Sequence, residues 1–121
     1  MEAQPLRLTP RWADAELLVV EAEGVFDAAS APLLCGPLVK LLGVGHRQFV
    51  VDAKRVTHFN AVGIRLLAKT LRRVRAEGGT LALVAGPDAR DALETAGFGG
   101  SSVLYATVGE ASRACKAPHR N

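Results

Sequence analysis

The residues best placed to do chemistry lie in a short turn, Asn60 to Gly63, between an apolar segment and a long amphipathic one. Asn60 suits the N-cap position of a helix, because its side-chain oxygen accepts a free N–H of the first turn. Gly63 costs helix stability but lets another chain come close. A helix start also favours an anion. The turn is therefore the first candidate for a functional centre, and a helix cap followed by a glycine is its purely structural interpretation.

Catalytic and metal-binding side chains do not gather in the sequence. His46, His58 and His119 are scattered, and no carboxylate–histidine–nucleophile set appears. Cys35 and Cys115 lie far apart without metal-ligand spacing, which predicts two reduced thiols in a cytoplasmic protein. We expect no metal, no cofactor and no enzymatic activity.

Length and composition predict one domain over all 121 residues, with a core from about residue 6 to residue 116 and short loose ends. The formal net charge of +3 is too small to indicate nucleic-acid binding. The first residues lack a signal-peptide pattern, and no apolar run approaches the ~20 residues of a membrane span. We therefore expect a cytoplasmic protein with no membrane span and no direct nucleic-acid contact.

The elements that must position the turn follow from hydrophobic periodicity and from Gly and Pro punctuation. Strands are expected at Leu6–Thr9, Glu16–Glu23, Gln48–Asp52, Thr80–Ala85 and Val103–Ala106. Helices are expected at Leu33–Leu42, at Val62–Glu77, from Gly86-Pro87-Asp88 to Ala96, and at Val108–Lys116. Gly24 should end or bend its strand, Asp27 and Ser30 are candidate caps, and Asp88 is expected to cap its helix. The segment between Asp52 and Asn60 is expected to be a loop.

This order predicts an α/β fold. Strands that alternate with helices imply a mostly parallel sheet of about five strands, covered by about four helices. The first two strands are too close in sequence for a crossover helix, so they should pair antiparallel.

Two of the helices carry distinct surfaces. The long helix after Asn60 has an inward stripe formed by Ile64, Leu67, Leu71 and Val74. Its opposite side is basic and carries Arg65, Lys69, Arg72, Arg73 and Arg75. This basic face is either a solvated surface or a docking surface for an acidic partner.

The helix Leu33–Leu42 is apolar on more than one side, and Pro37 should kink it. Either this helix is wedged against the sheet, or Leu33, Leu34 and their neighbours form an exposed patch. Such a patch would bind a partner or a second copy of the chain, giving a homodimer.

Four segments together resemble the STAS domain, the family of bacterial anti-sigma factor antagonists. They are Gly24–Ala31; Val50–Asp52 with Val56–Phe59; Asn60–Gly63; and Gly78–Val84 with Leu93–Phe98. The resemblance implies a STAS-like fold and a partner that is an anti-sigma factor, often a serine kinase. In the family, that kinase phosphorylates the first serine of the signature that Asn60–Gly63 matches, and the phosphate disrupts the complex.

The resemblance also implies a set of partner-binding residues, and it shows one departure. The expected contacts are Asp27, His58, Asn60, Ala61, Val62, Gly63, Arg65 and Lys69. Ala61 stands at the position of the family's phosphoserine and has no hydroxyl, so we expect no phosphorylation there. Thr57 is the nearest hydroxyl.

These observations favour a non-catalytic protein-binding regulator that sequesters an anti-sigma factor without the serine switch. One alternative is a STAS subunit of a lipid-transport or signalling-scaffold complex. Another is a small anion- or nucleotide-binding module that uses the helix start near Gly63.

Overall fold

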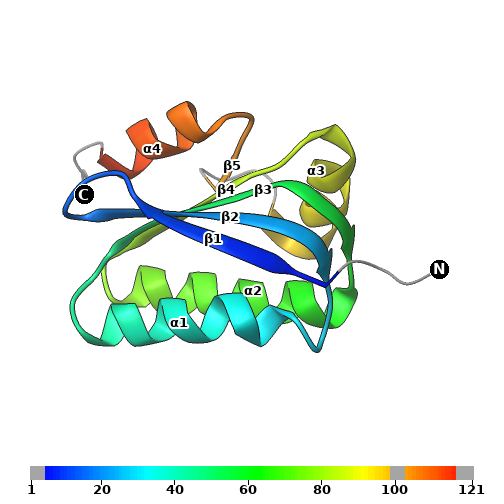
Figure 1. Ribbon diagram of the computed structural model, residues 1–121, viewed down its shortest axis with the longest axis horizontal. Coiled ribbons are helices and arrows are strands. Elements are labelled where there is room, and N and C mark those ends of the chain that lie inside the picture. Colours follow the sequence, from blue (N-terminus) through cyan, green and yellow to red (C-terminus); the bar gives the residue numbers. More distant parts are fainter. Residues whose placement is uncertain (1–4, 99–102, 117–121) are drawn as a thin grey trace.

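The computed structural model describes residues 5–98 and 103–116 of the chain (Figure 1). The strands are β1 (Arg7–Trp12), β2 (Leu17–Phe26), β3 (Gln48–Phe59), β4 (Thr80–Val84) and β5 (Leu104–Tyr105). The helices are α1 (Ala31–Gly43), α2 (Ala61–Ala76), α3 (Pro87–Leu93) and α4 (Val108–Lys116), and an irregular helical turn, Glu94–Phe98, follows α3.

The strands form one sheet in the order β1-β2-β3-β4-β5. β1 and β2 are antiparallel, and the other neighbouring strands are parallel. The predicted α/β architecture and the antiparallel first pair are both confirmed.

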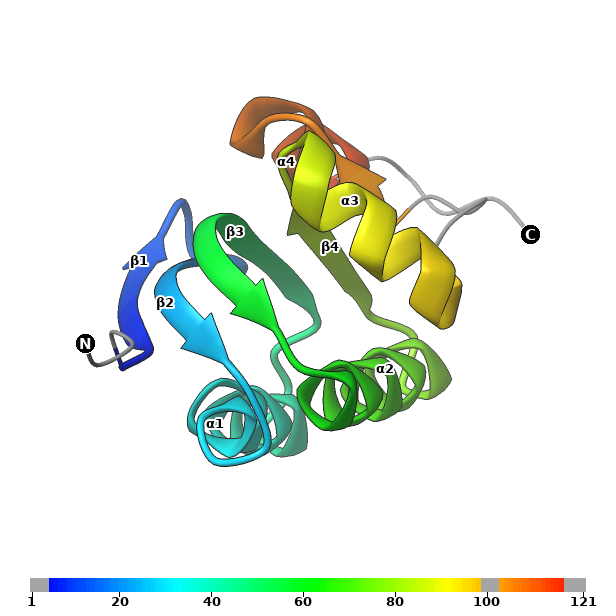
Figure 2. The same cartoon turned by 90° about the vertical axis from the view of Figure 1, so that its right-hand side faces the viewer.

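The two faces of the sheet are covered unequally. α1 and α2 lie side by side against one face, whereas α4 packs on the opposite face (Figures 1 and 2). The larger core joins α1, α2 and α3 to alternate residues of the strands, including Phe26, Phe49 and Leu83. A smaller core joins Ala111 and Cys115 of α4 to the other set of alternate residues. The two thiols are free and buried in these separate cores, as predicted for reduced cysteines.

β3 is longer than predicted, and the prediction of a loop after Asp52 is wrong. The strand continues to Phe59, because its second half pairs with the end of β2 in a register that runs from Glu23 opposite Arg55 to Phe26 opposite Phe59. The polar residues in this half of the strand are exposed, and a run of polar residues in a sequence is typical of a loop. Gly24 bends β2 rather than ending it, since its φ of 111° accompanies a register shift between Gly24 and Val25.

The ends of α3 and α4 correct one predicted cap and show another. Asp88 is not at the N-cap position of α3, because Gly86 occupies that position and Pro87 begins the helix, so Asp88 falls inside it. Proline favours the first turn of a helix, which moves the start ahead of the aspartate. Thr107 caps α4, because its hydroxyl accepts the Glu110 N–H at 3.1 Å.

α2 has the amphipathic pattern predicted for it. The stripe Ile64, Leu67, Leu71 and Val74 is buried, and the five basic residues of the opposite side are exposed. A helix held by one apolar stripe leaves its other side open to solvent or to a partner.

Candidate functional site

The start of α2 is fastened to the end of β2. The Asn60 N–H donates to the Phe26 carbonyl at 2.8 Å. A Cβ placed on Gly63 would lie 3.1 Å from the Asp27 carbonyl oxygen and 3.2 Å from a ring carbon of Phe26. Contacts this short would force the Asp27 backbone or the Phe26 ring to shift, so the absence of a side chain at Gly63 lets α2 approach the turn between β2 and α1.

Asn60 is the N-cap of α2, as predicted. Its side-chain Oδ1 accepts the Val62 N–H at 2.8 Å, and its carbonyl accepts the Ile64 N–H at 2.9 Å. The side chain thus occupies a donor that an anion would otherwise use. This geometry favours a rigid turn over an open anion site.

Asp27 orders the turn that faces Gly63. Its Oδ1 accepts the N–H groups of Ser30 at 2.9 Å and Ala29 at 3.1 Å. The Ser30 hydroxyl accepts the Asp27 N–H at 2.9 Å and donates to the Val25 carbonyl at 2.8 Å. Hydrogen bonds from Ser30, the backbone N–H first, lower the pKa of the Asp27 carboxyl, and Ala29 adds to the effect. Asp27 therefore fastens the turn ahead of α1, while Ser30 occupies the N-cap position without a side-chain cap bond.

The outer surface of the turn is apolar and open. Ala61 is exposed, and 50% of the Val62 surface is accessible, which makes Val62 one of the few large hydrophobic residues left in solvent. Arg65 and Lys69 are also exposed and follow Ala61 at intervals of four residues, so the three lie in a row along α2. The structure therefore brings together the predicted residues Asp27, Asn60, Ala61, Val62 and Gly63, with Arg65 and Lys69 extending from them.

His58 lies beside this turn at the end of β3 and is exposed. Together with Thr57 and Phe59 it lines a hollow of about 600 Å³, whose other wall is the start of α3. Thr57 is tied to the neighbouring strand, because its hydroxyl donates to the Gly24 carbonyl at 3.3 Å.

The wall formed by α3 was missed in the sequence. Pro87, Ala89 and Ala92 line the same hollow as His58. The available signal was the pair of small residues Ala89 and Ala92, three positions apart in this helix, together with Val56 and Phe59 in the segment expected to be a loop. Their meeting depends on how α3 crosses the sheet, which local pattern does not encode.

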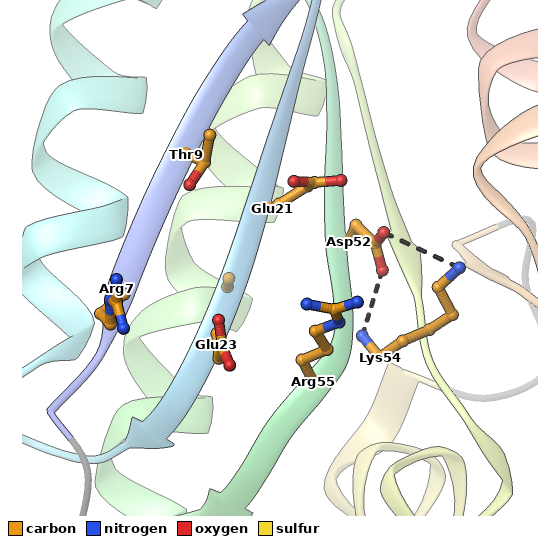
Figure 3. A pocket seen from close by; sticks show the side chains of 8 residues that line it. Arg7, Thr9, Glu21, Glu23, Asp52, Lys54 and Arg55 are labelled. Atoms are coloured by element: carbon orange, nitrogen blue, oxygen red, sulfur yellow. Dashed lines mark hydrogen bonds and ion pairs between the residues drawn. The ribbon is translucent and has the colours of Figure 1, made fainter.

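A second hollow, of about 200 Å³, lies on the face of the sheet that bears α4 (Figure 3). The buried Asp52 accepts the Lys54 N–H at 3.1 Å and forms an ion pair with its Nζ at 3.9 Å. Acidic and basic side chains from three strands line the hollow, and Glu21 and Arg55 are among them. The lining carries charges of both signs, and Asp52 is paired with Lys54. The hollow therefore shows no preference for a ligand of one charge.

The described residues contain no group of three or more His, Cys, Asp or Glu side chains arranged to hold a metal ion. Within the same ranges, no helix is long and apolar enough to cross a membrane.

Solved structures share this fold. An anti-sigma factor antagonist from Mycobacterium paratuberculosis is 25% identical and has a TM-score of 0.79, with coverage of 93% of this chain and 95% of that one. The Bacillus cell fate determinant SpoIIAA in its phosphorylated form is 18% identical, with a TM-score of 0.72 over 89% of this chain and 98% of its own. RsbS of Moorella thermoacetica is 18% identical, with a TM-score of 0.75 over 91% of this chain and 95% of its own.

None of the curated proteins matches the chain in sequence. The family model described as "Mlab, STAS domain" matches residues 10–106, which is most of the chain. Together with the sheet order and the shared fold, this match shows that the chain belongs to the STAS-domain family.

Proposed function

We propose that this STAS domain is a non-catalytic regulator that binds an anti-sigma factor, or a serine kinase of that class, through the start of α2. The observation that carries the proposal is the exposed pair Ala61 and Val62 on a turn fixed by Asn60 and Gly63. A preorganised apolar contact loses little conformational entropy when a partner covers it.

The charge beside this contact indicates the chemistry of the partner. Arg65 and Lys69 continue the surface along α2, and further exposed arginines follow them. A cationic surface of this kind steers an acidic partner and fixes its orientation more than it adds affinity. We propose that the partner presents an apolar centre to Val62 and carboxylates to the basic side chains.

The site has no means of switching by phosphorylation at its centre. Phosphoryl transfer needs an oxygen nucleophile, and the methyl side chain of Ala61 supplies none. The complex should therefore be indifferent to ATP turnover, whereas a phosphorylated turn would introduce a charge of about −2 into the contact.

The test begins with affinity capture of the partner from the native cell, using the whole chain as bait. Recovery of an anti-sigma factor or its kinase supports the proposal, and recovery of a transporter ATPase instead contradicts it. The captured kinase is then incubated with Mg-ATP and either the parent chain or Ala61→Ser. Peptide mapping should find phosphate on the variant's new serine and none between Asn60 and Gly63 of the parent.

The same assay locates any replacement acceptor. Phosphate on Thr57 of the parent, with ATP-dependent release of the partner, would contradict the loss of the switch. Phosphorylation of the variant at its serine, followed by release, would show that Ala61 alone removed the switch.

A further inference from the structure

An open apolar groove runs between β1 and the outer flank of α1. It has a volume of about 490 Å³. Its lining consists of Leu8, Pro10, Trp12, Leu18, Val20, Leu33, Leu34, Pro37, Leu38, Lys40 and Leu41. Trp12 is 47% exposed and Leu33 56% exposed, so two large apolar side chains at its margins meet solvent. α1 is therefore both packed against the sheet and partly exposed as an apolar surface, the two alternatives expected from the sequence. Leu34 and Leu38 are buried in the core, whereas Leu33 is exposed.

The groove exists because the helical layer stops short of the sheet edge. Neighbouring strands lie about 4.8 Å apart, whereas packed helices need 8–10 Å, so each helix covers about two strands. In Figure 2, α1 lies beneath β2 with α2 on its other side, and β1 projects past α1. The face of β1 that carries Leu8, Pro10 and Trp12 thus extends beyond the helices of this layer.

The charge of the groove is one-sided. Among the described residues that line the groove, Lys40 is the only charged one and none is acidic. Lys40 is exposed, and no ion pair joins it to another residue of the described ranges. A ligand that fills the groove would place a negative charge near this end of α1 most favourably.

We propose that the groove binds a helix of a protein partner, one that has an apolar face and an acidic residue near one end. Such a helix would extend the α1–α2 layer beneath β1 and bury its apolar stripe against sheet and helix together. From Leu33 to Leu41 the flank of α1 spans roughly 12 Å, and from Leu8 to Trp12 the strand spans roughly 13 Å. These lengths match about two turns of helix, whose acidic residue would pair with Lys40.

A second copy of the chain fits the groove less well. A two-fold interface places the same face of each copy against the other. Two concave grooves would then meet, and each would bring Lys40 with no acidic partner for it among the described residues of the groove. The observations therefore favour a different chain as the occupant.

The single tryptophan of the chain, Trp12, makes the proposal directly measurable. The probe is a designed alanine-based helical peptide without tryptophan, with leucines along one face and one glutamate at the end of that face. The intact protein is titrated with this peptide while Trp12 fluorescence is followed. We expect a saturable blue shift, at least tenfold weaker binding with Leu33→Asp, and several-fold weaker binding when lysine replaces the peptide's glutamate. The variant Lys40→Glu should reverse the preference between the two peptides.

Each other outcome counts against the proposal. No saturable change up to about 1 mM peptide overturns it, as does binding that Leu33→Asp leaves unchanged. Saturable binding of dodecanoate in place of the peptide assigns the groove to an acyl chain. A dimer in light scattering that Leu33→Asp converts to a monomer assigns it to a second copy. The thermal unfolding of each variant is recorded, and Val44→Asp, at a site that is 76% exposed and outside the groove, controls for the added charge.

Discussion

The first turn of α2 and the remainder of its exposed face differ in how they are tied to the fold. The first turn is held by the Asn60 cap and by close contact between Gly63 and the backbone of Asp27. The residues further along, such as Arg65 and Lys69, extend into solvent from the same helix. The comparison indicates that the first turn supplies shape, because its geometry is fixed, and that the later residues supply charge. Substitutions of Asn60 and Gly63, which hold the first turn, should therefore affect folding, whereas substitutions of exposed residues should act mainly on partner binding.

Gly63→Val should have the largest effect on stability. Its methyl groups would meet the Asp27 carbonyl and the Phe26 ring, and overpacking of this kind costs ~2 kcal/mol. Chemical denaturation should report that loss in the free energy of unfolding. The matched control is Gly43→Val at the end of α1, where an added Cβ meets nothing within 4 Å and the change should stay below ~0.5 kcal/mol. Equal losses at the two positions would remove the argument for a required close approach at Gly63.

Asn60→Ala should have an intermediate effect. It removes the acceptor for the Val62 N–H, and loss of a side-chain cap costs ~1 kcal/mol. Asn60→Asp keeps an oxygen acceptor and adds a negative charge at the positive end of the helix, so its free energy of unfolding should match or slightly exceed that of the parent. If the alanine and aspartate variants unfold alike, the cap does not hold the turn.

Single alanine substitutions at Arg65 and Lys69 should have the smallest effect on folding, within ~0.5 kcal/mol, because both side chains are exposed. Their effect should appear in association with the captured partner, as a slower rate at low salt that converges with the parent's rate at high salt. Arg72→Ala, further along the same face, measures how far the contact extends. Association rates that do not depend on salt would show that the basic face is a solvated surface and not a docking surface.

Much of the fold was predictable from sequence, because periodicity and punctuation are local signals. The buried centre of β3, the start of α2 at Asn60 and the α2 stripe all follow from patterns within about fifteen residues. The second half of β3 was not predictable, because its polar residues become a strand only through pairing with β2. The cap of α3 was misplaced because Pro87 and Asp88 compete for the same helix start.

The candidate site also has one part that was predictable from the sequence and one part that only the fold brings together. The residues of the turn are adjacent in sequence and could be listed, whereas the contact of Gly63 with Asp27 joins two segments more than thirty residues apart. The hollow between His58 and α3, and the groove beneath β1, depend on where helices cross the sheet. Sequence patterns indicated which side chains were unusual, and the fold decided which of them share a surface.

The most direct test of the central claim is the variant Ala61→Asp, studied for folding and binding in parallel. A carboxylate at the helix start should leave the free energy of unfolding unchanged or raise it by a few tenths to ~1 kcal/mol. Affinity for the partner should fall by several kcal/mol, because the carboxylate would be buried against the partner's apolar centre and would repel the carboxylates that the partner presents to Arg65 and Lys69. An unfolding midpoint equal to or above the parent's, together with lost binding, is the predicted result. A variant that melts normally and binds as tightly as the parent would contradict the claim that this turn is the contact surface.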